Sequence, residues 1–186
     1  MHLLLEGIED ARRAVSNLGA EILLRTIIGL DIQKEIQLID ELVAEGINCL
    51  AIAPADDNIL RDKINELADN GIPTVTFNAD IDGSKRLCFV GQDGELSGRA
   101  CASLTSAIIG NHGLVLPISG HRHNRSHTTR IKGFCSEMER CFPQVELLPV
   151  SFCQDDDAFT QQVTETTLRE HPDLAAIYVA ANGQAG

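Results

Sequence analysis

Helical and strand-like patterns of apolar residues alternate along most of the chain. Where apolar residues recur three or four positions apart, the spacing is that of a helix with one buried face. The helices predicted in this way lie at 3–18, 32–46, 59–70, 94–109, 128–141 and 158–170. Short, mostly apolar runs between them predict strands at 22–28, 49–53, 73–77, 87–90, 114–118, 145–152 and 175–181. This alternation is typical of an α/β fold with parallel sheets.

The alternation breaks once, near the middle of the chain. Between the strand that ends at Phe77 and the strand that begins at Leu87 there is only a polar loop and no helix. Two strands without a crossover helix indicate that the chain leaves one Rossmann-like lobe and enters another. We therefore predict an N-terminal lobe at 1–90, a C-terminal lobe at 91–186, and a hinge at Asn78–Asp93. A cleft between two lobes is a favoured ligand site.

Both ends of the pattern lack a covering element. The chain opens on a predicted helix with no strand before it, and it stops just after a predicted strand with no helix behind it. Each lobe would then keep an uncovered flank. We expect that both lobes are incomplete and that these residues are part of a longer protein.

Charge and cysteine content narrow the possible functions. A net charge of −12 argues against this chain itself binding a phosphate backbone, which needs clustered Lys and Arg. Six cysteines show neither a CxxC pattern nor paired metal spacing. Cys49 and Cys88 lie within apolar strand patterns, where cysteine packs as a small hydrophobic residue. We expect six reduced thiols and hence a cytoplasmic location.

Polar side chains follow several of the predicted strands. In open parallel sheets, ligands bind beyond the carboxyl ends of the strands. Carboxylates, carboxamides and a guanidinium there could bind adjacent hydroxyls of a sugar or polyol, and an aromatic ring could cover the sugar's apolar face. Asp31, Asp56 and Asp155 have the alternative role of helix caps. The residues at the strand ends are Asp56, Asp57, Asn78, Asp80, His121 to Arg125, Phe152 to Asp155, and Asn182.

Arg130 and a group of histidines have two interpretations each. Arg130 lies in the first turns of a predicted helix, where a cation is poorly placed for the helix dipole. It is either a surface ion-pair partner or a group that binds ligand. His121, His123 and His127 could suggest zinc, but no Cys or carboxylate completes the set at a fixed spacing, so a solvated loop is the alternative and we predict no metal.

Signatures of catalysis are missing from the sequence. It contains no GxSxG elbow, no P-loop and no HExxH motif. The segment GQDGELSG lacks the GxGxxG spacing of dinucleotide-binding loops. We therefore predict no cofactor and a function other than an enzyme.

Segments along nearly the whole chain resemble those of type I periplasmic-binding folds. In order, the segments are EGINCLAIAPADD, GIPTVTFNAD, VGQDGELSGR, TTRIKGF and HPDLAAIYVAAN. That group includes the sugar-binding cores of LacI-type transcription regulators and the ribose-type receptors of transporters. The resemblance implies a hinged, two-lobed core that binds an effector or solute.

The resemblance also implies roles for single residues. Arg130, at the arginine of the R-x-x-G-F motif, and Asn182, at the asparagine after a strand, would bind the sugar. Asn78 stands where many relatives have Asp, and Phe152 would supply an aromatic wall. Asp93 and His121 complete the predicted ligand-binding set.

Two main hypotheses follow. The first is the effector-binding core of a LacI-type regulator, cytoplasmic and homodimeric, with a DNA-binding module outside this chain. The alternative is the solute-binding receptor of a sugar transporter. The cysteines, and an N-terminal segment unlike a signal peptide, favour the first. An enzyme on a similar fold is a third possibility.

Overall fold

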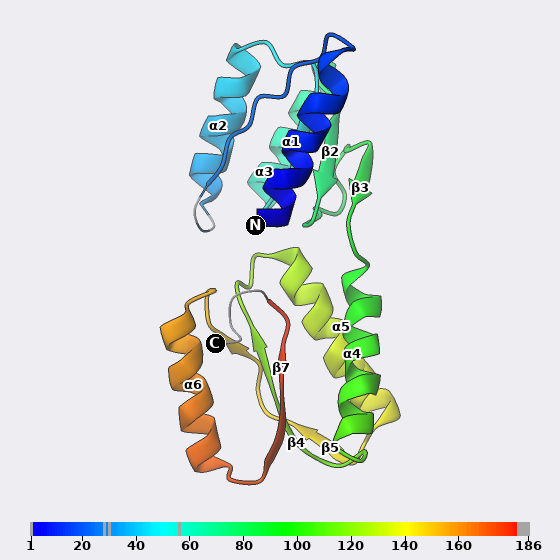
Figure 1. Cartoon of the computed structure of the whole chain (residues 1–186), viewed down its shortest axis with the longest axis vertical. Coiled ribbons are helices and arrows are strands. Elements are labelled where there is room, and N and C mark those ends of the chain that lie inside the picture. The colour runs from blue at the N-terminus through cyan, green and yellow to red at the C-terminus, as the bar shows by residue number, and fades with distance from the viewer. Residues whose placement is uncertain (1, 28, 30, 56, 182–186) are drawn as a thin grey trace. The chain divides into compact units, whose positions relative to one another are not determined.

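The computed structural model describes residues 2–27, 29, 31–55 and 57–181 (Figure 1). The chain groups into two compact units, Met1–Ile47 and Asn48–Gly186, which are described separately. None of the described helices is both long enough and apolar enough to cross a membrane.

The first unit contains helix α1 (His2–Ser16) and helix α2 (Ile32–Ala44). Asp31 caps α2 as predicted, because its carboxylate accepts a hydrogen bond from the Lys34 amide at 3.0 Å. The strand predicted at 22–28 is wrong over its described residues, 22–27, which form no regular secondary structure. A strand needs a partner ladder, and the Ile22 carbonyl instead accepts from the guanidinium of Arg12.

The first sheet of the second unit has three parallel strands in the order β1-β2-β3. The elements are β1 (Leu50–Ile52), α3 (Asn58–Asp69), β2 (Thr74–Phe77) and β3 (Cys88–Val90). Val75 at the centre pairs with Ala51 on one side and Cys88 on the other. The predicted burial of Cys49 and Cys88 is wrong, because both are exposed: Cys49 lies just before β1, and Cys88 lies in β3, an edge strand of the described sheet.

The second sheet is built around one long strand, β4 (Gly113–Ser119). It pairs in parallel with three further strands, and helices complete the unit. These elements are α4 (Gly94–Ile108), α5 (Arg125–Cys141), β5 (Val145–Leu147), β6 (Ser151–Phe152), α6 (Asp157–Glu170) and β7 (Leu174–Val179). The structure thus confirms an α/β fold with parallel sheets.

The strand predicted at 145–152 is divided in two. β5 pairs with the start of β4 and β6 with its end. Pro149 lies between them and has no amide hydrogen to donate, so the ladder is interrupted there.

The core around the second sheet lies on both faces of β4. Val115 faces α4 and α5 together with Phe134 and Tyr178, whereas Leu116 and Ile118 face the α6 side (Figure 1). This follows from the two-residue period of a strand. The rings of Phe134 and Tyr178 stack with centroids 3.9 Å apart.

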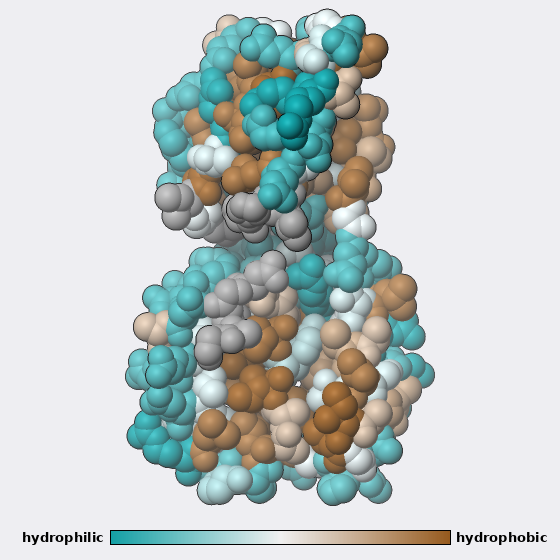
Figure 2. All heavy atoms as spheres, in the orientation of Figure 1, coloured by the Kyte–Doolittle hydropathy of each residue, from teal (hydrophilic) through white to brown (hydrophobic). Residues whose placement is uncertain are grey.

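Helices α4 and α5 pack closely because glycines line their contact. A Cβ on Gly133 would lie 2.1 Å from the Glu95 carbonyl oxygen. The opposite face of α4 is apolar and exposed, and Figure 2 shows hydrophobic surface over this helix. The large apolar residues exposed there are Leu96, Leu104 and Ile108.

The chain passes from the first sheet to the second between Val90 and Gly94. Among the described strands, the two sheets share none. The assignment of lobes to 1–90 and 91–186 remains a prediction.

Candidate functional site

A hollow of about 410 Å³ lies at the carboxyl ends of β2 and β3, beside the first turns of α4 and α5. In an open parallel sheet this edge is where ligands bind. The polar residues that line it include Asn78, Asp80, Gln92, Asp93, Arg125 and Thr129. Two of the predicted site residues, Asn78 and Asp93, therefore share one hollow.

Asn78 closes the end of β2. Its backbone is left-handed, with φ of 60°, a conformation that asparagine tolerates better than most residues. Its amide donates to the Val90 carbonyl at 3.1 Å, which joins the ends of β2 and β3. This turn brings the Asn78 side chain to the wall of the hollow.

Asp80 is held by the protein itself. One carboxylate oxygen accepts from Thr76 Oγ1 at 2.7 Å and Arg86 Nε at 2.5 Å, and the other accepts from Arg86 Nη2 at 2.6 Å. Burial acts to raise the pKa of Asp80, but the hydrogen bonds from Arg86 and Thr76 outweigh it, so the pKa is lowered. Both oxygens are occupied, and Asp80 acts here as an anchor of the loop. Sequence reasoning missed Arg86, because a pair within an irregular loop has no periodic signal.

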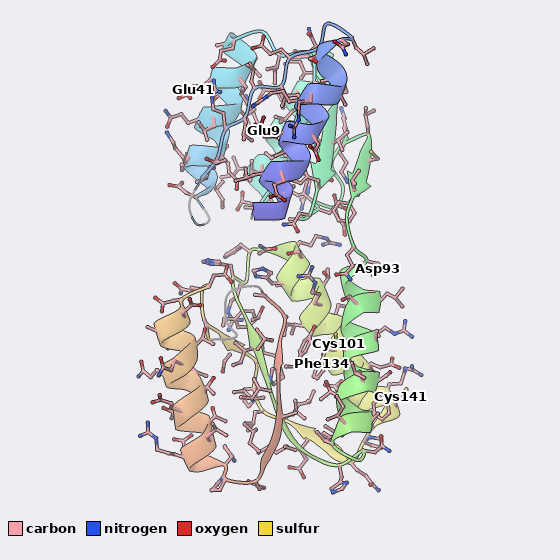
Figure 3. The ribbon with its side chains drawn as sticks, in the orientation of Figure 1. Glu9, Glu41, Asp93, Cys101, Phe134 and Cys141 are labelled. Carbon is pink, nitrogen blue, oxygen red and sulfur yellow. The ribbon has the colours of Figure 1, made fainter. Side chains whose placement is uncertain are left out.

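Asp93 caps α4, as its position in the sequence predicts. Its carboxylate accepts from the Leu96 amide at 2.9 Å. The residue stands at the first turn of α4, next to the hollow (Figure 3). Its capping role and its position at the site are compatible, because the cap uses one carboxylate oxygen.

Arg130 connects the ends of strands that belong to the two different sheets. Its Nη1 donates to the Ala180 carbonyl, just after β7, at 3.3 Å, and its Nη2 donates to Gln92 Oε1 at 3.4 Å. Within the described residues Arg130 forms no ion pair, so the interpretation as a surface ion pair finds no partner there. Gln92 also lines the hollow, and sequence reasoning missed it although it directly precedes Asp93. The predicted partner Asn182 lies outside the described residues.

Phe152 and His121 lie at the carboxyl edge of the second sheet. The guanidinium of Arg122 sits 3.8 Å from the centroid of the Phe152 ring and covers one face of it. His121 Nε2 is 3.6 Å from a carboxylate oxygen of Asp155. The roles of both residues in binding ligand remain predictions.

Two of the predicted helix caps are displaced by one residue. Asp156 rather than Asp155 caps α6, accepting from the Phe159 amide at 2.8 Å, because the helix begins at Asp157. Asp57 caps α3 by accepting from the Ile59 amide at 2.7 Å, whereas Asp56 lies outside the described residues. Within the described part of the chain, no group of three or more His, Cys, Asp or Glu side chains is arranged to hold a metal ion.

These features define a class of protein: an α/β binding domain whose polar groups gather at the ends of parallel strands from two sheets. Residues 5–186 match the model of the periplasmic binding protein domain family. The chain belongs to that family.

Individual relatives agree with this assignment. The chain is 22% identical over 148 residues to the ribose import binding protein RbsB of Bacillus subtilis (strain 168), a match that covers 80% of this chain and 48% of the relative. The structure of a transporter solute-binding protein of Burkholderia graminis C4D1M, solved with D-arabinose, matches with a TM-score of 0.87 at 22% identity. The match covers 94% of this chain and 60% of the Burkholderia chain. The sugar-binding protein of a sugar transporter from Bacillus halodurans matches with a TM-score of 0.82 at 29% identity, and the match covers 96% of this chain and 60% of that relative. The chain thus spans about half the length of the curated relative.

Proposed function

We propose that this chain is the sugar- or polyol-binding core of a solute-binding receptor that serves a membrane transporter. The relatives described above support this proposal, because they are named as transporter binding proteins for sugars. They favour a transport receptor over a transcription regulator.

The observation that carries the proposal is the placement of Arg130. Its guanidinium bonds only to neutral acceptors among the described residues, at distances near the long end of the hydrogen-bond range. Arginine has five N–H donors in a planar fork, so several remain for a ligand. Adjacent hydroxyls on a sugar ring suit this fork.

The hollow supplies complementary groups beside that fork. Asn78 and Gln92 carry carboxamides, which both donate and accept, as sugar hydroxyls do. Arg86 already bonds to both carboxylate oxygens of Asp80. The Glu95 carboxylate pairs with Lys132, whereas the cap leaves one carboxylate oxygen of Asp93 unused. Carboxamides beside such a carboxylate oxygen suit the hydroxyls of a polyhydroxylated molecule.

A LacI-type regulator core is the second candidate function. All six cysteines are free thiols, which is common in the reducing cytoplasm and uncommon in exported proteins. A cytoplasmic location, a homodimer and DNA binding through a further module belong to this candidate and remain predictions. Sequencing the complete gene separates the two, because a helix-turn-helix module would favour the regulator and an export leader would favour the receptor.

A thermal-shift screen tests the proposed function. D-ribose, D-arabinose, D-tagatose and sugar alcohols are added singly to the protein. A ligand present at 100 times its Kd adds about 2.7 kcal/mol to the free energy of unfolding. If no sugar or polyol raises the melting temperature, the proposed function is wrong.

A further inference from the structure

His127 is a buried histidine in the first turn of α5, next to Ser126, which lines the hollow. Only 8% of its surface is exposed. It lies against the loop after β4, which carries Gly120 and His121, and against Asp155 in the turn before α6. Its environment therefore connects three segments at the carboxyl edge of the second sheet.

One hydrogen bond determines the protonation state that fits this environment. The backbone amide of His121 donates to His127 Nδ1 at 3.3 Å. A nitrogen that accepts cannot carry a proton, so the observed arrangement requires neutral His127 with its hydrogen on Nε2.

The charges around the ring come from every segment that packs on it. Asp155 faces it from the β6–α6 turn, His121 from the loop after β4, and Arg130 from the next turn of its own helix. Burial lowers the pKa of His127 below 6.5, and Arg130 and His121 act in the same direction, whereas Asp155 acts against them.

The contacts leave little room for the ring to move. A Cβ on Gly120 would lie 2.1 Å from Asp155 Oδ1 and 2.7 Å from His127 Nδ1. Gln154 and Asp155 both adopt left-handed backbone, with φ of 54° and 58°. Such conformations persist only where the surroundings enforce them. The turn and the loop are therefore held in one arrangement around His127.

An unpaired hydroxyl lies at the same edge of the sheet. Ser119 Oγ is fully buried and has no hydrogen-bond partner within the described residues. By strand alternation Ser119 is on the same face of β4 as Val115, which is the face that α5 covers. A buried unpaired hydroxyl costs free energy, so a polar ligand or water has a reason to bind here.

We propose that neutral His127 is a positioning residue for sugar binding, which ties the loop after β4 to α5 and thereby fixes Arg130. Protonation at Nδ1 removes the acceptor for the His121 amide and places a cation near Arg130. It also makes His127 compete with His121 for Asp155. Acid thus loosens the loop and weakens ligand binding. The inference rests on the proposed function, because it takes the ligand of Arg130 to be a sugar.

Calorimetric titration with D-ribose and D-arabinose between about pH 5 and 8 tests the proposal. For the native protein, the affinity falls in acid by up to about tenfold per pH unit below the pKa of His127. His127→Asn keeps an acceptor near the position of Nδ1 but cannot be protonated, so its affinity stays level over this range. His112→Asn, at an exposed histidine, is the matched control and behaves as the native protein does. An equal fall in acid for native protein and His127→Asn overturns the proposal.

Nuclear magnetic resonance separates this proposal from the proposed function. We expect the His121 amide and the Arg130 side-chain N–H signals to shift with the same midpoint as the His127 ring. Independent midpoints overturn the positioning role even if sugar binds. If neither sugar binds at any pH, the proposed function fails for these two sugars. The positioning role of His127 is then decided by whether the His121, Arg130 and His127 signals shift with one midpoint.

Discussion

Gly98 on α4 lies so close to Arg130 on α5 that a Cβ added to it would stand 2.0 Å from the Arg130 carbonyl oxygen. The same atom would be 2.7 Å from the Phe134 amide nitrogen. Both neighbours are backbone atoms, which cannot rotate away. The backbone of Arg130, the proposed ligand-binding residue, is therefore held in place by a glycine on the neighbouring helix.

Gly98→Ala should lower the free energy of unfolding by several kcal/mol, because the two helices must separate to admit the methyl group. Denaturant unfolding measures this. Gly7→Ala is the matched control, since Gly7 is also helical but has nothing within 4 Å of its Cβ position. It should gain up to about 1 kcal/mol from the better helix propensity of alanine. Equal effects of the two substitutions would show that the close approach of α4 and α5 is absent in solution.

Arg86→Ala should destabilise the protein by about 1–3 kcal/mol, because it leaves the half-buried Asp80 carboxylate without its main donors. Lys85→Ala, at an exposed pair with Asp69, is the control and should change stability by less than about 1 kcal/mol. Denaturant unfolding compares the two variants. A smaller effect for Arg86→Ala than for Lys85→Ala contradicts the anchoring role of Asp80.

The Asp80 contact also predicts a dependence of stability on acid. The pKa of Asp80 in the folded protein is lowered from 3.8 despite burial, since the hydrogen bonds from Arg86 and Thr76 favour the charged form. Its contribution is therefore complete above pH 3.8 and is lost as the pH falls through the folded pKa. The free energy of unfolding of Asp80→Asn should therefore fall less between neutral and acid pH than that of the native protein, and denaturant unfolding at a series of pH values measures both. Identical acid profiles would argue against a charged Asp80.

Tyr178 provides a direct optical test of the second core. It is the single tyrosine in the sequence, and burial raises its pKa to about 12. The folded state thus keeps its proton where the unfolded chain loses it, so the contribution of Tyr178 to stability is complete below pH 10 and is lost as the pH rises toward 12. The ultraviolet absorbance of tyrosinate follows this titration. A midpoint at the ordinary value would mean that Tyr178 is exposed.

Phe134→Ala should cost about 3–5 kcal/mol of unfolding free energy, because the fully buried ring stacks on Tyr178. Phe159→Ala, at a ring that is 45% exposed, is the control and should cost clearly less. Chemical denaturation gives both values.

The sequence predicted the parallel sheets well, because strands and helices differ in the period of their apolar residues. It failed at 22–27, where an apolar run has no partner strand among the described residues, and at Pro149, where a missing donor divides a ladder. Periodicity measures burial, whereas a strand also needs a neighbour. That requirement is not visible in the sequence itself.

The candidate site was predictable where a residue follows a strand directly. Asn78 lies at the hollow for that reason, because it directly follows β2, whereas Asp93 lies there as the N-cap of α4. Arg86 could not be found in this way, and His127 was considered only as one of three histidines and not as the partner of the His121 amide, because irregular loops bring these partners together. Distances between loops depend on tertiary packing.

Calorimetric titration of Arg130→Ala with the sugar that stabilises the native protein most tests the central claim directly. Removing two or more charge-assisted hydrogen bonds should weaken binding by at least about 100-fold. The melting temperature without sugar should stay within a few degrees of the native value, and Arg169→Ala, at an exposed arginine on α6, should bind as the native protein does. Unchanged affinity of Arg130→Ala would contradict the account, because the guanidinium between Ala180 and Gln92 would then have no part in holding the ligand.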